Sequence, residues 1–176
     1  MTLAYWCVLI AIFMPYLGTA TAKFLGPGYG PRANQDPRAF LGTLEGWRKR
    51  ANSAQLNGFE VTPAFAAAVI IAHQAGGAEQ ALLDQLAVAF IVSRALYFIC
   101  YLAGWGPLRS LGWFSGMGLI AALFISAYIS LKIGTVIAIL WVATMALLIT
   151  GLSFFFRETA IAAKGPASRG SISRKP

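Results

Sequence analysis

The sequence predicts an all-α integral membrane protein: a four-helix transmembrane bundle followed by a fifth transmembrane helix, with the N-terminus outside and the C-terminus in the cytoplasm. Of the 176 residues, 58% are hydrophobic and only 11% are charged, whereas a soluble domain carries about 25% charged residues. Apolar runs long enough to cross a bilayer, about 20 residues each, recur along the chain. These observations exclude an ordinary soluble enzyme, a disordered protein and a disulfide scaffold, and the length allows one membrane domain.

The predicted spans follow one another closely. The first covers residues 3–25 and contains Pro15, where we expect a kink. No basic segment precedes its apolar run, so we expect a retained helix rather than a cleavable signal. The second begins at Leu44 as an amphipathic segment and becomes apolar over residues 61–75. The other three spans cover residues 82–105, 109–131 and 133–156.

Two stretches fall outside the predicted spans. Residues 26–40 are rich in glycine and proline, which predicts irregular backbone. Residues 164–176 are basic and poor in apolar side chains, which predicts disorder or contact with the membrane surface. We therefore divide the chain into a four-helix transmembrane domain (1–130), an additional transmembrane helix (131–157) and a basic cytoplasmic tail (158–176).

The positions of the lysines and arginines predict the orientation. The chain has 14 basic and 6 acidic residues, a formal net charge of +8, and basic residues gather on the cytoplasmic side of membrane proteins. With five spans and the N-terminus outside, twelve of the 14 lie inside, Lys132 lies outside and Arg94 lies within a span. Topology therefore explains the net charge, and we expect membrane lipids but no nucleic acid as partners.

Two ionisable residues, Glu60 and Arg94, fall well inside predicted spans, where a charge costs about 2.5–3.5 kcal/mol on insertion scales. With a rise of about 1.5 Å per residue, they lie roughly 20 Å and 17 Å from the inner boundary, on neighbouring helices. We expect them to pair, directly or through one water or ligand. Such a pair would either line a polar cavity or only lock the two helices together.

Further polar side chains share a helix face with each of these two residues. They fall within arcs of roughly 80° on the second helix and roughly 60° on the third. Two polar stripes descending toward the inner surface predict a pocket that opens to the cytoplasm, with Arg109 at its mouth, and arginine and tyrosine donors suit an anionic ligand with carboxylates or a thiolate. The stripes consist of Arg50, Ser53, Asn57 and Glu60 on the second helix and Arg94, Tyr97 and Tyr101 on the third.

Other kinds of site find little support in the sequence. His73 is the only histidine, so we expect no metal site. Cys7 and Cys100 lie in apolar runs, and we expect both to be buried free thiols. The fourth span contains Gly112 and Gly116, a small-xxx-small face that would serve either contact between subunits or packing inside one.

Residues Trp47–Phe65 (WRKRANSAQLNGFEVTPAF), Arg94–Tyr101 (RALYFICY) and Pro107–Trp113 (PLRSLGW) resemble the MAPEG superfamily, the membrane-associated proteins in eicosanoid and glutathione metabolism, and especially its small bacterial branch. The resemblance covers about residues 1–130. It implies a four-helix unit that forms a homotrimer, in the inner membrane for a bacterial member. It also implies that glutathione binds between neighbouring subunits near the cytoplasmic side.

The same resemblance assigns roles to single residues. Arg109 matches the arginine assigned to thiolate stabilisation in the leukotriene-forming synthase of the family, and it would be the catalytic residue. Gln55 matches a ligand position and points away from the Glu60 face, as a residue that reaches a neighbour's site would. The other matching glutathione-contacting positions are Asn57, Glu60, Tyr97 and Tyr101, to which the polar stripes add Arg50 and Arg94.

The chain departs from the family pattern at three places. Two residues before Gln55, where the family has an arginine, this chain has Ser53. Directly after the glutamate, where the family has a tyrosine, it has Val61. Residues 131–176 have no counterpart in the four-helix unit. Arg50, one turn from Ser53, would substitute for the missing arginine. Two functions therefore compete. One is a membrane-embedded glutathione-dependent transferase or peroxidase acting on lipophilic electrophiles; the other is a non-catalytic accessory subunit that docks to a larger membrane complex through its extra helix.

Overall fold

Four long helices dominate the computed structural model, which describes residues 1–127, 140–151 and 153. They are α1 (Leu3–Phe24), α4 (Gly46–Ala75), α5 (Gln80–Ala103) and α6 (Gly106–Ser126). Each is long and apolar enough to cross a membrane. The described residues contain helices and no strand, so the predicted all-α membrane fold and its first four spans are confirmed.

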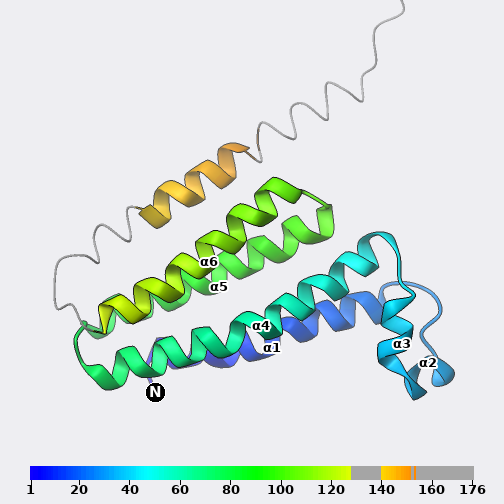
Figure 1. Ribbon diagram of the computed structural model, residues 1–176, viewed down its shortest axis with the longest axis horizontal. Helices are drawn as coiled ribbons and strands as arrows, with labels where there is room; N and C mark the ends of the chain where they lie inside the picture. The colour runs from blue at the N-terminus through cyan, green and yellow to red at the C-terminus, as the bar shows by residue number, and fades with distance from the viewer. Residues whose placement is uncertain (128–139, 152, 154–176) are drawn as a thin grey trace, which may run out of the picture.

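The four helices lie side by side, and successive ones run in opposite directions (Figure 1). The helix α1 packs along α4, and α5 packs along α6. The helix α5, like α4, contacts all three of the others. Side chains on its inward faces are therefore buried from several directions, and this helix carries Arg94 and Tyr97.

One end of the bundle is basic. The ends of α1, α4, α5 and α6 meet there with the two short helices α2 and α3 (Figure 1). At the opposite end, Glu79 and Asp84 are present, and the described residues include no lysine or arginine there. We call these the basic end and the acidic end; their sidedness in the membrane remains a prediction. The basic end carries Lys23, Arg32, Arg38, Arg48, Lys49, Arg50 and Arg109.

The prediction of irregular backbone over residues 26–40 is wrong in part, because two short helices form there. They are α2 (Pro31–Gln35) and α3 (Pro37–Gly42), and each has a proline in its first turn. A proline fits that position because its fixed φ is helical and its missing N–H would be unpaired there anyway. The side chain of Asp36 also caps α3 by accepting a hydrogen bond from the Ala39 amide at 3.0 Å.

The contact between α1 and α4 compensates for Pro15. The helix α1 continues through this proline, which cannot donate to the carbonyl four residues earlier. That carbonyl, of Ala11, accepts a hydrogen bond from the hydroxyl of Thr62 at 3.2 Å. The two helices approach closely here, since a Cβ added to Gly58 would lie 2.8 Å from Cγ of Pro15.

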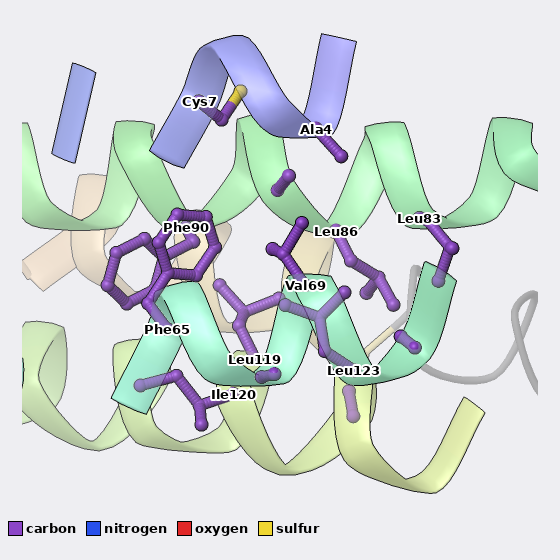
Figure 2. Close-up of a cluster of buried hydrophobic side chains, with 14 of the residues drawn as sticks. Ala4, Cys7, Phe65, Val69, Leu83, Leu86, Phe90, Leu119, Ile120 and Leu123 are labelled. Atoms are coloured by element: carbon purple, nitrogen blue, oxygen red, sulfur yellow. The ribbon is translucent and has the colours of Figure 1, made fainter. Parts of the chain in front are cut away.

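The apolar core fills the half of the bundle nearer the acidic end (Figure 2). Phe65 of α4 and Phe90 of α5 stack there, with ring centroids 3.9 Å apart and planes 9° from parallel. Cys7 lies in the same cluster, and both it and Cys100 are free and buried, as predicted. A smaller apolar cluster lies nearer the basic end and consists of Ala22, Leu41, Leu44 and Ala51.

The predicted fifth span, residues 133–156, lies only partly within the described residues. Leu140–Gly151 form an apolar helix beside α6 (Figure 1). Met145 and Leu148 of this helix are buried. Residues 128–139, 152 and 154–176, including the predicted basic tail, lie outside the described residues.

Candidate ligand-binding site

A guanidinium buried inside the bundle is the centre of the candidate site. Arg94 of α5 is only 8% exposed. Its Nη2 donates to Oδ1 of Asn57 on α4 at 2.7 Å, and Nδ2 of Asn57 donates to Oε2 of Glu60 at 3.3 Å. The sequence predicts that Glu60 and Arg94 pair directly or through one water or ligand; among the described residues they do not pair directly, and the side chain of Asn57 links them. Glu60 is exposed on the outer side of α4. The partner of Arg94 is therefore the neutral side-chain amide of Asn57, which is nearer to it than Glu60 is.

Aromatic contacts extend this arrangement toward the basic end. The guanidinium of Arg94 lies 4.0 Å from the centroid of the Tyr97 ring. Tyr97 contacts Tyr101 edge to face, with centroids 5.4 Å apart, and the guanidinium of Arg109 lies 4.8 Å from the Tyr101 ring. Both arginines thus make cation–π contacts. Six predicted site residues form one continuous series of contacts, which we call the polar row: Glu60, Asn57, Arg94, Tyr97, Tyr101 and Arg109.

The glycine face of α6 positions the middle of the polar row. A Cβ added to Gly112 would lie 3.4 Å from Cβ of Tyr97, and one added to Gly116 would lie 3.5 Å from Cδ of Arg94. The small-xxx-small face therefore packs against α5 inside one subunit, and a Cβ at either glycine would find ordinary van der Waals contacts there. Of the two roles left open by the sequence, the structure selects this one.

A hollow of about 360 Å³ lies between α5 and α6 at the basic end. Its volume falls in the range of small-molecule sites, about 300–1,000 Å³. Sequence reasoning missed Ser110, Trp113 and Phe114 in its wall, although Trp113 is four residues after Arg109 and so had to share its helix face. The hollow is lined by Tyr97, Tyr101, Arg109, Ser110, Trp113 and Phe114.

Two other predicted site residues lie apart from the polar row. The guanidinium of Arg50 donates from Nε and Nη2 to the carbonyl of Leu102 at 3.0 and 2.8 Å, so this arginine caps the carboxyl end of α5. Gln55 faces α1, where its backbone and Cβ lie against Gly18. Its Oε1 is buried without a hydrogen-bond partner. Ser53, in place of the family arginine, donates back to the carbonyl of Lys49 at 3.1 Å.

The bundle and its polar row define a class of protein, namely an integral membrane protein with a row of arginine and tyrosine side chains across its helices. Residues 3–129 match the MAPEG family. Because this match covers well over half of the chain, the chain belongs to the MAPEG family, whose members are membrane proteins related to glutathione and eicosanoid metabolism. No curated protein and no solved structure matches the chain. Among the described residues, no cluster of three or more His, Cys, Asp or Glu side chains could hold a metal ion.

Proposed function

We propose that this protein is a glutathione-dependent transferase or peroxidase that acts on lipophilic electrophiles dissolved in the bilayer. The observation that carries the proposal is the polar row: four family-type ligand positions, Asn57, Glu60, Tyr97 and Tyr101, lie in one series with two arginines. The polar row ends at Arg109, beside a hollow whose volume suits a small molecule. This arrangement favours a ligand that extends from the bundle interior to the basic end.

The donors and acceptors of the polar row suit the tripeptide chemically. Glutathione carries two carboxylates and one ammonium group. Arg94 has a buried Nη1 without a hydrogen-bond partner, which is a donor for a carboxylate. Glu60 presents an exposed carboxylate, which would accept from the ammonium group. Arg50 is already engaged by Leu102, so we assign it to holding α5 rather than to the ligand.

Arg109 is the residue best placed to act on the sulfur. A nearby cation lowers the pKa of a thiol because it stabilises the thiolate. In the proposed step the thiol proton passes to water, the thiolate attacks the electrophilic carbon, and a carbon–sulfur bond forms as the leaving group departs with its electron pair. If the protein acts as a peroxidase, two glutathione molecules reduce one hydroperoxide to an alcohol and water and are joined in one disulfide.

We propose a homotrimer as the working form. Glu60 is the fifteenth of the 30 residues of α4 and is exposed in the single subunit. A carboxylate that faces lipid at such a depth costs about 2.5–3.5 kcal/mol on insertion scales. A neighbouring subunit that covers this face would remove that cost and complete the walls of the site.

Thiolate spectroscopy tests the proposal. The protein, purified in a non-ionic detergent, is titrated with glutathione at neutral pH, and the ultraviolet absorbance of the thiolate is recorded. We expect a saturable signal that is lost in Arg109→Ala, while binding of the tripeptide persists. Lys49→Ala is the matched control, because Lys49 is an exposed cation of the basic end. Absence of any binding at millimolar glutathione would contradict the proposal.

A second candidate is the accessory subunit, and specific observations favour it. Val61, in place of the family tyrosine, is buried in the apolar core and offers no hydroxyl. The helix Leu140–Gly151 turns an apolar face away from the bundle, since Leu140, Val142, Leu147 and Ile149 are 59–65% exposed. Failure to bind glutathione, together with a native assembly larger than a homotrimer that depends on residues 131–157, would support this candidate instead.

A further inference from the structure

A second cavity, of about 380 Å³, lies between α5, α6, the start of α1 and the helix Leu140–Gly151. Its volume falls in the range of small-molecule sites, about 300–1,000 Å³. The cavity opens at the surface of the bundle, because Leu3, Val88 and Val142 of its wall are exposed. These residues lie on apolar helices, so the mouth faces the bilayer. Part of the wall lies beyond residues 3–129, the part of the chain that matches the MAPEG family.

Asp84 of α5 gives this mainly apolar cavity a charged hydrogen-bond acceptor. Its Oδ1 accepts from the backbone amide of Ala4 and from Nε2 of Gln80, both at 2.8 Å. Among the described residues both of these hydrogen bonds use Oδ1 and come from neutral groups, so Oδ2 is available to a donor of a ligand. Asp84 is the fifth residue of α5, about 6 Å from the start of this helix. The acceptor therefore lies near the membrane surface at the acidic end.

Trp141 adds a hydrogen-bond donor to the wall of the same cavity. Its Nε1 is buried and has no hydrogen-bond partner among the described residues, which is unfavourable for a polar atom. An indole N–H donates and does not accept, so the missing partner must be an acceptor. The wall thus offers an acceptor in Asp84 and an unpaired donor in Trp141. A hydroxyl group suits both, because it donates one hydrogen bond and has two acceptor lone pairs.

Other headgroups suit these two side chains less well. A carboxylate would be repelled by Asp84, and an ammonium group has no acceptor for the indole N–H of Trp141. An ether or an ester would accept from Trp141 but has no donor for Asp84. A hydroxyl group is also neutral, so it enters an apolar cavity with a smaller loss of hydration energy than an ion.

We propose that this cavity binds a lipophilic alcohol whose hydroxyl donates to Asp84 and accepts from Trp141. The apolar body of the alcohol would lie against the part of the wall deeper in the bundle, which includes Leu86, Ala89 and Leu119. An alcohol dissolved in a bilayer keeps its hydroxyl near the membrane surface and its hydrocarbon part inside. The cavity has the same order, with Asp84 near the helix start and apolar side chains beyond it. The site depends on the helix Leu140–Gly151 and rests on neither of the candidate functions.

Photolabelling of the full-length protein in phosphatidylcholine nanodiscs tests the proposal, because the headgroup of this lipid has no hydrogen-bond donor. The probe is a long-chain alcohol with a photoreactive diazirine beside the hydroxyl-bearing carbon, and labelled residues are identified by mass spectrometry. We expect label within residues 82–89 or at Trp141, which line the cavity. Unlabelled oleyl alcohol should displace the probe at a concentration about tenfold lower than oleyl methyl ether, which has no donor for the charged acceptor.

Two conservative variants, each with a matched control, test the two partners. Trp141→Phe keeps an aromatic ring and removes the donor, and Trp47→Phe makes the same change at an exposed residue outside the cavity. Asp84→Asn keeps an acceptor for the Ala4 amide and removes the charge, and Glu79→Gln makes the same change at an exposed carboxylate outside the cavity. We expect labelling to fall by about threefold or more in the two cavity variants and to stay unchanged in the controls.

Three results would overturn the proposal. Equal displacement by the alcohol and its methyl ether would show a plain apolar groove. Stronger displacement by oleylamine than by oleyl alcohol would show a site for cations. Labelling that is the same in Trp141→Phe as in Trp47→Phe would show that the indole N–H takes no part. If Asp84→Asn does not fold, the ether comparison and the pair of tryptophan variants still decide.

Discussion

The bridge made by Asn57 can be tested by double-mutant cycles. Its amide accepts from the buried Nη2 of Arg94 at 2.7 Å and donates to the exposed Glu60 at 3.3 Å. The structure therefore predicts strong coupling between Asn57 and Arg94 and weak coupling between Glu60 and Arg94. Two cycles, Asn57→Leu with Arg94→Gln and Glu60→Gln with Arg94→Gln, measure these two quantities.

The magnitude follows from the burial and charge of the donor. Hydrogen bonds between transmembrane helices contribute about 0.6 kcal/mol on average, and a charged donor about doubles that value. Hydrogen bonds to charged groups in soluble proteins are worth about 1.5–3 kcal/mol. We therefore expect a coupling of about 1–3 kcal/mol for Asn57 with Arg94. For Glu60 with Arg94, which are linked only through Asn57, we expect a smaller coupling than for Asn57 with Arg94, but not zero, because residues of one hydrogen-bond network couple.

The assay is unfolding of each variant in mixed micelles with increasing denaturing detergent, followed by circular dichroism. Asn57→Asp serves as an internal comparison, because its carboxylate would pair with Arg94 directly but repel the neighbouring carboxylate of Glu60; it should keep the coupling to Arg94 and lose the link to Glu60. A coupling energy below about 0.5 kcal/mol in the Asn57 cycle would refute the bridge. A coupling energy in the Glu60 cycle larger than that in the Asn57 cycle would also refute it, and would indicate that Glu60 and Arg94 pair directly.

Three further predictions concern packing and topology. Gly58→Ala should destabilise the protein by about 1–3 kcal/mol, because its Cβ would lie 2.8 Å from Pro15. Gly116→Ala, whose Cβ finds only ordinary contacts, should be neutral or stabilise by about 0.5–1 kcal/mol; equal thermal unfolding of the two variants would contradict the described helix contacts. A reporter fused after Pro176 should be active only as a cytoplasmic fusion, and activity outside would disprove five spans with the N-terminus outside. Deletion of residues 131–176 should leave the oligomer intact by light scattering, whereas a monomeric product would show that the extra helix is part of the trimer core.

The sequence alone determined the class of fold and named the residues that the structure joins in the polar row. Span length and apolar composition decide that the chain lies in a membrane, because the bilayer imposes both. Charges within membrane spans are so costly that Glu60 and Arg94 stood out as candidate functional positions. Helical periodicity then placed Asn57, Tyr97 and Tyr101 on the same faces, and the structure joins all of them with Arg109 in the polar row.

The sequence could not decide which of these residues bind one another. Periodicity fixes the face of a helix but not its rotation or height against a neighbour, and a shift of one turn exchanges Glu60 for Asn57 as the partner of Arg94. In the same way Arg50 shares a stripe with the site residues, yet it reaches the carbonyl of Leu102.

The packing of α1 and α6 was also decided only by the tertiary structure. The packing of Gly112 and Gly116 of α6 against α5 depends on which helix faces those glycines, and a small-residue pattern does not identify its partner. The cavity beside Asp84 needs α1, α5, α6 and the helix Leu140–Gly151, so no single segment of sequence contains it. Local patterns report what one helix presents to its surroundings, and the site arises from how four helices arrange those surfaces together.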